Sequence, residues 1–162
     1  LSVNSFPTSG TVMFNDVNIH EEPGSYLRHL GLVHDEESLP LHLTAAELLE
    51  WILRKRKMWK EGGADKIRDI FDRLSLPEYD DPMGTYSTGM KKKAQIAAAF
   101  ILEPDVLIMD EPLRGLDQST RGVVTGMIGE ARDRGALIFM SSHSAENLSG
   151  LFDEQLEFPL KR

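Results

Sequence analysis

Three runs of consecutive apolar residues divide the sequence and predict the strands of a sheet. They lie at Leu30–Val33, Val106–Met109 and Ala136–Met140, and an unbroken apolar run suits a strand that is buried on both faces. A helical pattern over Ser87–Leu102 precedes the second run, and another over Ser119–Asp133 precedes the third. This alternation of helix and strand predicts right-handed crossovers and a parallel sheet.

The two ends of the chain carry shorter patterns. Thr11–Phe14 predicts a short strand, which a turn at Asn15 and Asp16 follows. Near the carboxyl end, the sequence predicts a helix over Ser144–Leu151 and a last strand over Gln155–Phe158.

Between residues 36 and 81 the pattern changes and no sheet strand is evident. Thr44 and Glu47 have the spacing of a capping box, and apolar residues recur at helical spacing over residues 45–53. Two helices are predicted here, one from Thr44 to the glycines at 62 and 63 and one over residues 64–74. The segment therefore resembles a helical insertion between elements of the sheet.

The stretch from residue 54 to residue 60 is mostly basic, with Met58 and Trp59 interleaved. Such a stretch either contacts a partner or forms the solvated face of a helix. The solvated face is the more ordinary interpretation, and the sequence alone leaves both open.

Composition narrows the class of protein. The 162 residues are 41% apolar, which suffices for one buried core, and the chain contains no cysteine for a disulfide framework. A formal net charge of −8 disfavours nucleic acid or an anionic membrane as the main partner. The longest apolar stretch, Ala94–Leu102, is too short to span a bilayer.

The apolar run at residues 106–109 leads directly into two carboxylates, Asp110 and Glu111. In parallel α/β sheets the carboxyl ends of the strands are the usual position of ligands. Asp110 can hold Mg²⁺ through its water shell while Glu111 orients or deprotonates an attacking water. Taken alone, the pair is equally well explained as a core strand that ends in a solvated acidic turn.

Three further features accompany the acidic pair. Tyr86–Met90, with the sequence Tyr-Ser-Thr-Gly-Met, lies at a predicted helix start, where free N–H groups favour an anion, although a Ser cap near a Gly is also ordinary helix chemistry. Gly115–Asp117 would turn the chain and cap the next helix. Ser141–His143 follows the third apolar run, but a lone strand-end histidine is more often a surface residue.

In their order and spacing these features resemble those of the ATP-binding cassette ATPases. Residues 86–93 resemble the family's signature motif, and Val106–Pro112 resembles its Walker B strand with the catalytic glutamate. Gly115–Asp117 resembles the D-loop and Ser141–His143 the H-switch. The resemblance implies an α/β fold of the P-loop NTPase or RecA-like kind with an inserted helical subdomain. Residues 1–35 and 103–162 would form the core, and residues 36–102 the helical and signature subdomain.

The resemblance also implies roles for individual residues. Asp110 would anchor Mg²⁺, Glu111 would polarise the attacking water, and His143 would contact the γ-phosphate of ATP. The signature residues would act in trans on the ATP of a second cassette subunit in a head-to-tail dimer, and Asp117 would lie at the same interface. The signature residues expected to bind this nucleotide are Ser87, Thr88 and Gly89.

The sequence departs from the family pattern in three places. No G-x-x-x-x-G-K-S/T phosphate loop occurs in the 162 residues, and the family pattern would put it just before Leu1. We therefore expect a fragment or truncated gene product, with a naturally minimal protein as the less favoured alternative, and we expect weak ATP binding and negligible turnover. Asp35 stands where the family usually has the Q-loop Gln, and it is a candidate Mg²⁺ ligand. The signature has Thr88 and Met90 where many members have Gly and Gln.

The resemblance implies the ATP-binding subunit of a transporter, which couples Mg-ATP hydrolysis to a separate transmembrane permease. Such a subunit would be cytoplasmic and peripheral at the inner face of the cell membrane. Two alternatives are a soluble cassette ATPase without a transport role and a degenerate, non-catalytic cassette that binds or regulates a partner. The acidic charge argues against the alternative that acts on nucleic acid.

Overall fold

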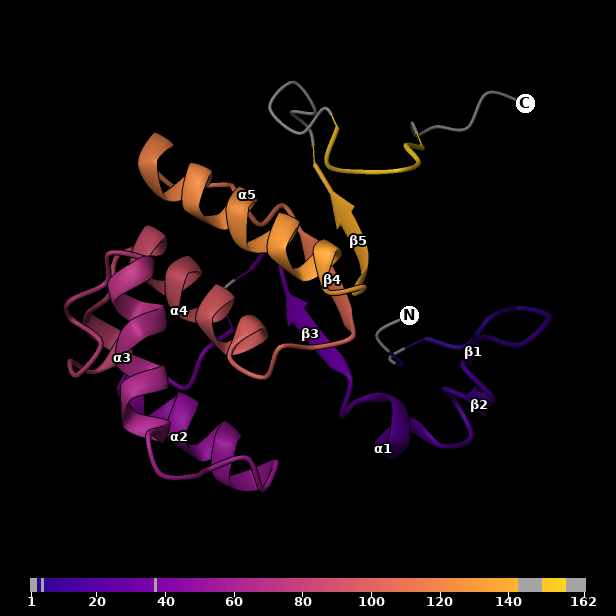
Figure 1. Ribbon diagram of the computed structural model, residues 1–162, viewed down its shortest axis with the longest axis horizontal. Coiled ribbons are helices and arrows are strands. Elements are labelled where there is room, and N and C mark those ends of the chain that lie inside the picture. Colours follow the sequence, from indigo (N-terminus) through magenta and orange to yellow (C-terminus); the bar gives the residue numbers. More distant parts are fainter. Residues whose placement is uncertain (1–2, 4, 37, 143–149, 157–162) are drawn as a thin grey trace.

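A three-stranded parallel sheet forms the centre of the computed structural model, which describes residues 3, 5–36, 38–142 and 150–156 (Figure 1). The strands are β3 (Leu30–Val33), β4 (Val106–Asp110) and β5 (Leu137–Ser141). They pair in the order β3-β4-β5, with both pairings parallel. The parallel α/β sheet predicted from the apolar runs is confirmed.

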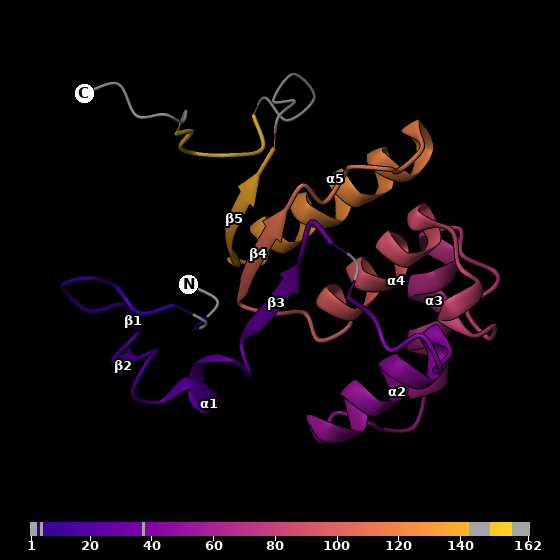
Figure 2. The same ribbon diagram turned by 180° about the vertical axis from the view of Figure 1, so that it is seen from behind.

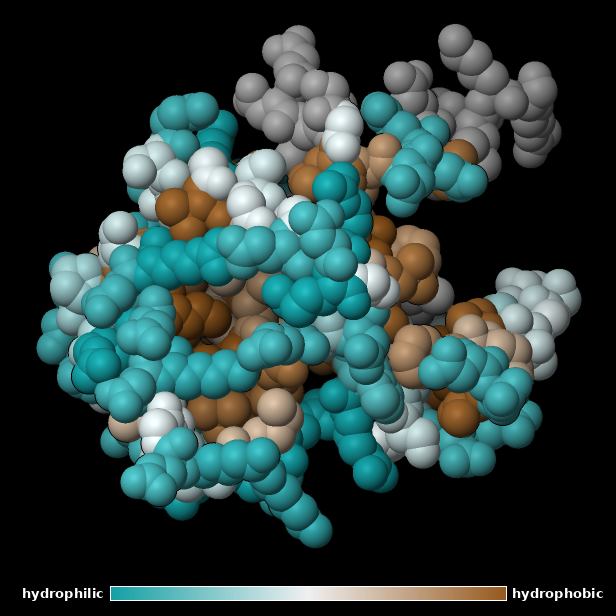
Figure 3. Space-filling model, viewed as in Figure 1, coloured by the Kyte–Doolittle hydropathy of each residue, from teal (hydrophilic) through white to brown (hydrophobic). Residues whose placement is uncertain are grey.

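Two helices precede the second and third strands and cover one face of the sheet. They are α4 (Thr88–Phe100) and α5 (Gln118–Asp133), which run side by side with their amino ends at the same end of the sheet (Figures 1 and 2). Leu107 and Met109 of β4 are buried in the core that these helices share. Apolar side chains show between the helices in Figure 3, whereas the outer ridges of the helices are hydrophilic.

A small amino-terminal unit lies at the amino end of β3. It contains β1 (Met13–Phe14), β2 (Val17–Asn18) and the short helix α1 (Pro23–Tyr26). The two strands are antiparallel, so the predicted strand and turn are confirmed, although the strand is only two residues long. Ile19 and Tyr26 bury a second, smaller apolar cluster with Val106.

The described part of residues 36–81 contains two helices and no strand of the sheet, as predicted. The helices are α2 (Ala45–Lys55) and α3 (Gly63–Arg73), and a 3-10 turn, η1 (Met83–Thr85), leads to α4. The capping box forms, because the Thr44 Oγ1 accepts from the Glu47 N–H at 3.1 Å and Glu47 Oε2 accepts from the Thr44 N–H at 2.9 Å. α2 and α3 pack through buried apolar residues that join the main core: Leu49, Leu53, Ile67 and Phe71.

The predicted end of α2 at the glycines was wrong, because the helix ends at Lys55. Lys57 adopts a left-handed backbone with φ 57°, and the Met58 N–H donates to the Leu53 carbonyl at 2.8 Å. The Lys57 N–H donates to the Arg54 carbonyl at 3.0 Å. Together these bonds form a Schellman motif, which satisfies the last carbonyls of the helix without a glycine.

The carboxyl-terminal predictions lie largely outside the described residues. Of the helix predicted over residues 144–151, only Gly150 and Leu151 are described, and both lie in a turn. Gln155 and Leu156 are not in a strand, and residues 157 and 158 are not described. Among the described helices, none combines the length and apolar character that a bilayer crossing requires.

Gly31→Ala is expected to lower the free energy of unfolding by about 1–3 kcal/mol, because it overpacks the contact between β3 and α4. A Cβ at residue 31 would lie 2.6 Å from the Ala99 carbonyl oxygen and 2.8 Å from both Leu107 and Pro104. Urea denaturation measures the change. The matched control is Gly122→Ala in α5, where a Cβ meets nothing within 4 Å and alanine favours the helix. Equal stability of the two variants would contradict this packing.

Candidate active site

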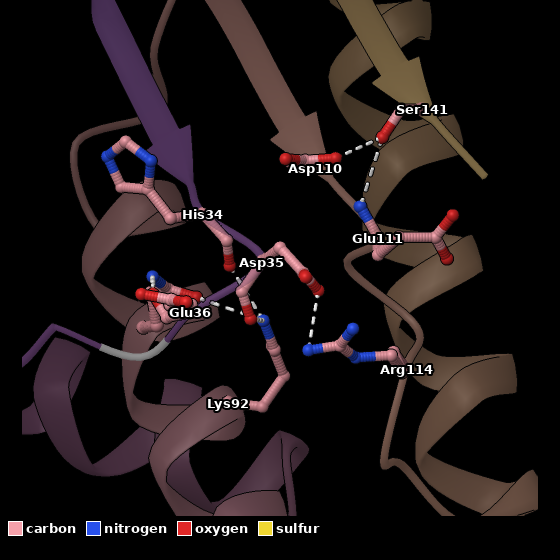
Figure 4. A network of polar contacts seen from close by, with 9 residues as sticks. His34, Asp35, Glu36, Lys92, Asp110, Glu111, Arg114 and Ser141 are labelled. Atoms are coloured by element: carbon pink, nitrogen blue, oxygen red, sulfur yellow. Dashed lines mark hydrogen bonds and ion pairs between the residues drawn. The ribbon is translucent and has the colours of Figure 1, made fainter.

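The polar residues at the ends of the three parallel strands meet at one edge of the sheet (Figure 4). Asp35 follows β3 after one intervening residue, Asp110 ends β4 with Glu111 next to it, and Ser141 ends β5. Because the strands are parallel, their carboxyl ends share this edge. Asp35, Asp110 and Glu111 therefore lie at the same edge of the sheet.

Ser141 connects the Asp110 carboxylate to the backbone of Glu111. It lies beside Asp110 in the strand register, and its hydroxyl donates a short hydrogen bond to Asp110 Oδ1. The Glu111 N–H lies 3.3 Å from Ser141 Oγ and 3.2 Å from the Ser141 carbonyl oxygen. Sequence analysis placed Ser141 beside a candidate histidine but gave it no role of its own.

The backbone at Glu111 turns its side chain away from Asp110. Glu111 has φ 44°, a left-handed conformation that costs a residue with a Cβ about 1–2 kcal/mol. In Figure 4 the Glu111 carboxylate points to the opposite side from Asp35. The two adjacent acidic groups thus face different directions, which suits separate tasks.

Asp35 is held by groups from two other segments. Arg114, which follows the acidic pair, places its Nη2 2.8 Å from Asp35 Oδ1. That oxygen is buried and receives no hydrogen bond, so the guanidinium approaches it at ion-pair distance but outside hydrogen-bond geometry. The carbonyl oxygens of His34 and Asp35 accept from Lys92 Nζ at 2.7 and 2.9 Å.

Lys92 is fully buried, with 0% of its surface exposed. It lies in the second turn of α4, so it attaches this helix to the backbone that follows β3. Gln95, one turn further along, also contacts the His34 backbone. Sequence analysis did not single out Lys92, because nothing in three consecutive lysines shows which one points inward.

The signature-like segment begins α4. Ser87 is the N-cap, and its hydroxyl accepts from the Met90 N–H at 3.2 Å. Ser87 and Thr88 are exposed. A Cβ at Gly89 would lie 3.1 Å from the Gly115 carbonyl oxygen, so this glycine allows α4 to approach the loop before α5.

Asp117 caps the amino end of α5, as predicted. Its Oδ1 accepts from the Thr120 N–H at 2.9 Å, and its Oδ2 accepts from the Thr120 hydroxyl at 2.7 Å. Two hydrogen bonds lower the pKa of Asp117: the one from the Thr120 side chain has the larger effect, and the one from the Thr120 backbone adds to it. The carboxylate is therefore ionised at neutral pH, next to the loop that Gly89 contacts. His143, the other candidate, lies outside the described residues.

Tyr86→Phe is expected to flatten the fall of stability at alkaline pH. The Tyr86 hydroxyl donates to the Glu78 carbonyl at 2.6 Å, and burial raises the pKa of Tyr86 to about 12. Because the folded pKa lies above the unfolded value of 10.0, this contribution is complete below pH 10 and is lost as the pH rises toward 12. Urea denaturation between pH 9 and 11.5 measures it. If wild type and variant lose stability in parallel, the assignment is wrong.

Comparison with known sequences decides the family. Residues 1–114 match the sequence model of the ABC transporter family. The chain belongs to the ABC transporter family. This match includes the acidic pair at residues 110 and 111 and the signature-like segment at residues 86–90.

Relatives of this ABC transporter chain come from bacteria and animals. It is 32% identical over 149 residues to rat ATP-binding cassette sub-family A member 7, covering 91% of this chain and 7% of the relative. It is 27% identical to the uncharacterized ABC transporter ATP-binding protein YybJ of Bacillus subtilis, covering 93% and 68%. It is 29% identical to the bacitracin transport ATP-binding protein BcrA of Enterococcus faecalis, covering 92% of this chain and 48% of that protein.

Solved structures of ATP-binding cassettes superpose on this chain. An ATP-binding subunit of an ABC transporter superposes with a TM-score of 0.81 at 25% identity, covering 88% of this chain and 60% of that chain. A dimeric ATP-binding cassette in a post-hydrolysis state with ADP and Pi superposes with a TM-score of 0.76 at 19% identity, covering 88% and 66%. The second likeness concerns the fold alone. The P-loop NTPase-like fold class predicted from the sequence is confirmed.

Proposed function

We propose that this chain is the ATP-binding part of a transporter, in which Mg-ATP hydrolysis is coupled to transport through a separate permease. The convergence of Asp35, Asp110 and Glu111 at one sheet edge carries this proposal. Several relatives have names that include transport, such as the bacitracin transport ATP-binding protein. The chain spans only part of each relative, so coupling and substrate belong to the proposal.

In this proposal the residues at the sheet edge activate water for hydrolysis in their own subunit. The amino ends of α4 and α5 contribute to the nucleotide site of a second subunit. Glu111 orients and deprotonates the attacking water, and His143 contacts the γ-phosphate. Ser87, Thr88, Gly89 and Asp117 face the ATP of a second cassette subunit in a head-to-tail dimer. The contact of Gly89 with Gly115 supports a common surface for these segments, since it places the start of α4 against the loop before α5.

The residues present fit a magnesium ion that takes most of its ligands from water and phosphate. Mg²⁺ is usually bound through one or two carboxylates, and Asp35 and Asp110 supply two at this edge. Asp35 Oδ1 is paired with Arg114 Nη2 at 2.8 Å, so it would ligate an ion only after Arg114 has moved away. Among the described residues no group of three or more His, Asp or Glu side chains could hold an ion alone. A bound Mg²⁺ would neutralise charge on the phosphates.

The proposal divides the chain into a core of residues 1–35 and 103–162 and a helical subdomain of residues 36–102. The helical subdomain would contact the permease, at the cytoplasmic face of the membrane. A soluble cassette ATPase without a permease is the main alternative. A non-catalytic, regulatory cassette is the other alternative.

We expect the 162-residue chain to bind Mg-ATP with a millimolar dissociation constant and to hydrolyse it no faster than the background. Its edge offers mainly carboxylates, and the backbone amides and lysine of a phosphate loop are absent from the sequence. A fusion that places a glycine-rich P-loop segment before Leu1 should hydrolyse ATP at least about 100-fold faster. Phosphate release measures both rates. An inactive but folded fusion would favour the non-catalytic alternative.

A further inference from the structure

Arg114 brings a positive charge to an edge that otherwise presents carboxylates. A tight turn, in which the Arg114 N–H donates to the Glu111 carbonyl at 3.1 Å, directs the chain back under the strand ends. From there the guanidinium reaches Asp35, across the space in front of β4 (Figure 4). Lys92 also lies close to Asp35, but its ammonium group is buried against backbone carbonyls.

The Arg114 guanidinium can easily leave Asp35 for another acceptor. The Arg114 side chain is 59% exposed and the Asp35 side chain 32% exposed. The guanidinium lies 2.8 Å from Asp35 Oδ1 without hydrogen-bond geometry. The guanidinium itself is solvent-exposed and its contact lacks hydrogen-bond geometry, so a better acceptor can take it from Asp35.

A nucleotide phosphate is such an acceptor. Guanidinium groups bind phosphate oxygens through two parallel N–H donors, which is stronger and more specific than the present contact. A polyphosphate at this edge would also face the repulsion of the carboxylates there, which the positive charge of Arg114 offsets.

We propose that Arg114 binds the terminal phosphate of the nucleotide within the same subunit, and that Asp35 holds its guanidinium when no phosphate is present. This inference rests on the proposed nucleotide-binding function and adds a phosphate-binding residue to it. Asp35 and the phosphate compete for Arg114. Removal of the Arg114 guanidinium should therefore weaken nucleotide binding, and removal of the Asp35 charge should strengthen it.

The test is a titration of the 162-residue chain with ADP up to about 20 mM at fixed ionic strength. EDTA removes divalent ions, and the chemical shifts of the backbone amides in NMR spectra report the binding. Arg114→Ala should raise the dissociation constant about tenfold, as expected for one lost charge-assisted contact. Arg114→Lys should fall between Arg114→Ala and wild type. Asp35→Asn, which keeps the shape but releases Arg114, should lower the dissociation constant a few-fold.

The matched control is Arg28→Ala, which removes the same charge from the opposite, amino end of the sheet and should leave affinity unchanged. Amide spectra of the free variants confirm that each is folded. If wild type binds ADP and both Arg114 variants bind it equally well, this inference is wrong and the proposed function stands. If no variant binds ADP, with Mg²⁺ or without it, both are wrong.

Discussion

Replacement of Lys92 by methionine is expected to lower the free energy of unfolding by about 3 kcal/mol. The substitution keeps the length of the side chain but removes the ammonium donor from the carbonyl oxygens of His34 and Asp35. A buried acceptor that loses its partner costs about 1–3 kcal/mol. Two such carbonyls cannot be replaced by apolar groups, because they belong to the backbone. Urea denaturation measures the loss.

Lys93→Met provides the matched control for this prediction. Lys93 is the next residue of α4, and its Nζ donates to the Ser75 carbonyl at 3.0 Å in a solvent-exposed contact. Water can replace that donor, so the change should be below about 1 kcal/mol. Hydrogen exchange adds a local readout, since only the Lys92 variant should lose protection at residues 33–36. Equal losses in the two variants would show that Lys92 does not hold this segment.

Local patterns in the sequence were enough to predict the sheet and the edge at which its polar residues meet. The apolar runs are unbroken and have the length of a strand, and parallel pairing places the carboxyl ends of the strands at one edge of the sheet. Asp110 and Glu111 could therefore be placed from the sequence. Thr44 and Asp117 were likewise predictable as helix caps, because capping depends on neighbours within three residues.

Two kinds of feature were not predictable: a backbone conformation that its residue type rarely adopts, and contacts between residues distant in sequence. The end of α2 was missed because Lys57 occupies a left-handed position that sequence rules assign to glycine. Arg114 and Lys92 act on Asp35 from positions 79 and 57 residues away in sequence, and the pattern of charges does not specify such pairs. The hydrogen bond of Ser141 to Asp110 depends on the register of β5 against β4.

The second large effect is expected at Glu111. In the fusion that carries a P-loop segment, Glu111→Gln should lower the rate of ATP hydrolysis at least about 100-fold, because a positioned base typically contributes 10²–10⁴-fold. Glutamine keeps the size of the side chain, and the backbone bonds of residue 111 to Ser141 do not involve the carboxylate. Phosphate release under saturating Mg-ATP measures the rate, and thermal melting should show little change.

Glu103→Gln removes the same charge elsewhere and serves as the control. Glu103 pairs with Lys66 at 2.7 Å on the surface, and that hydrogen bond, more than the charge of Lys66 itself, lowers the pKa of Glu103. Its loss should affect stability slightly and hydrolysis not at all. If Glu111→Gln retains activity like Glu103→Gln, the water is activated by another group. Glu111 would then have no catalytic role and would only be part of a solvated acidic turn, the alternative that the sequence alone left open.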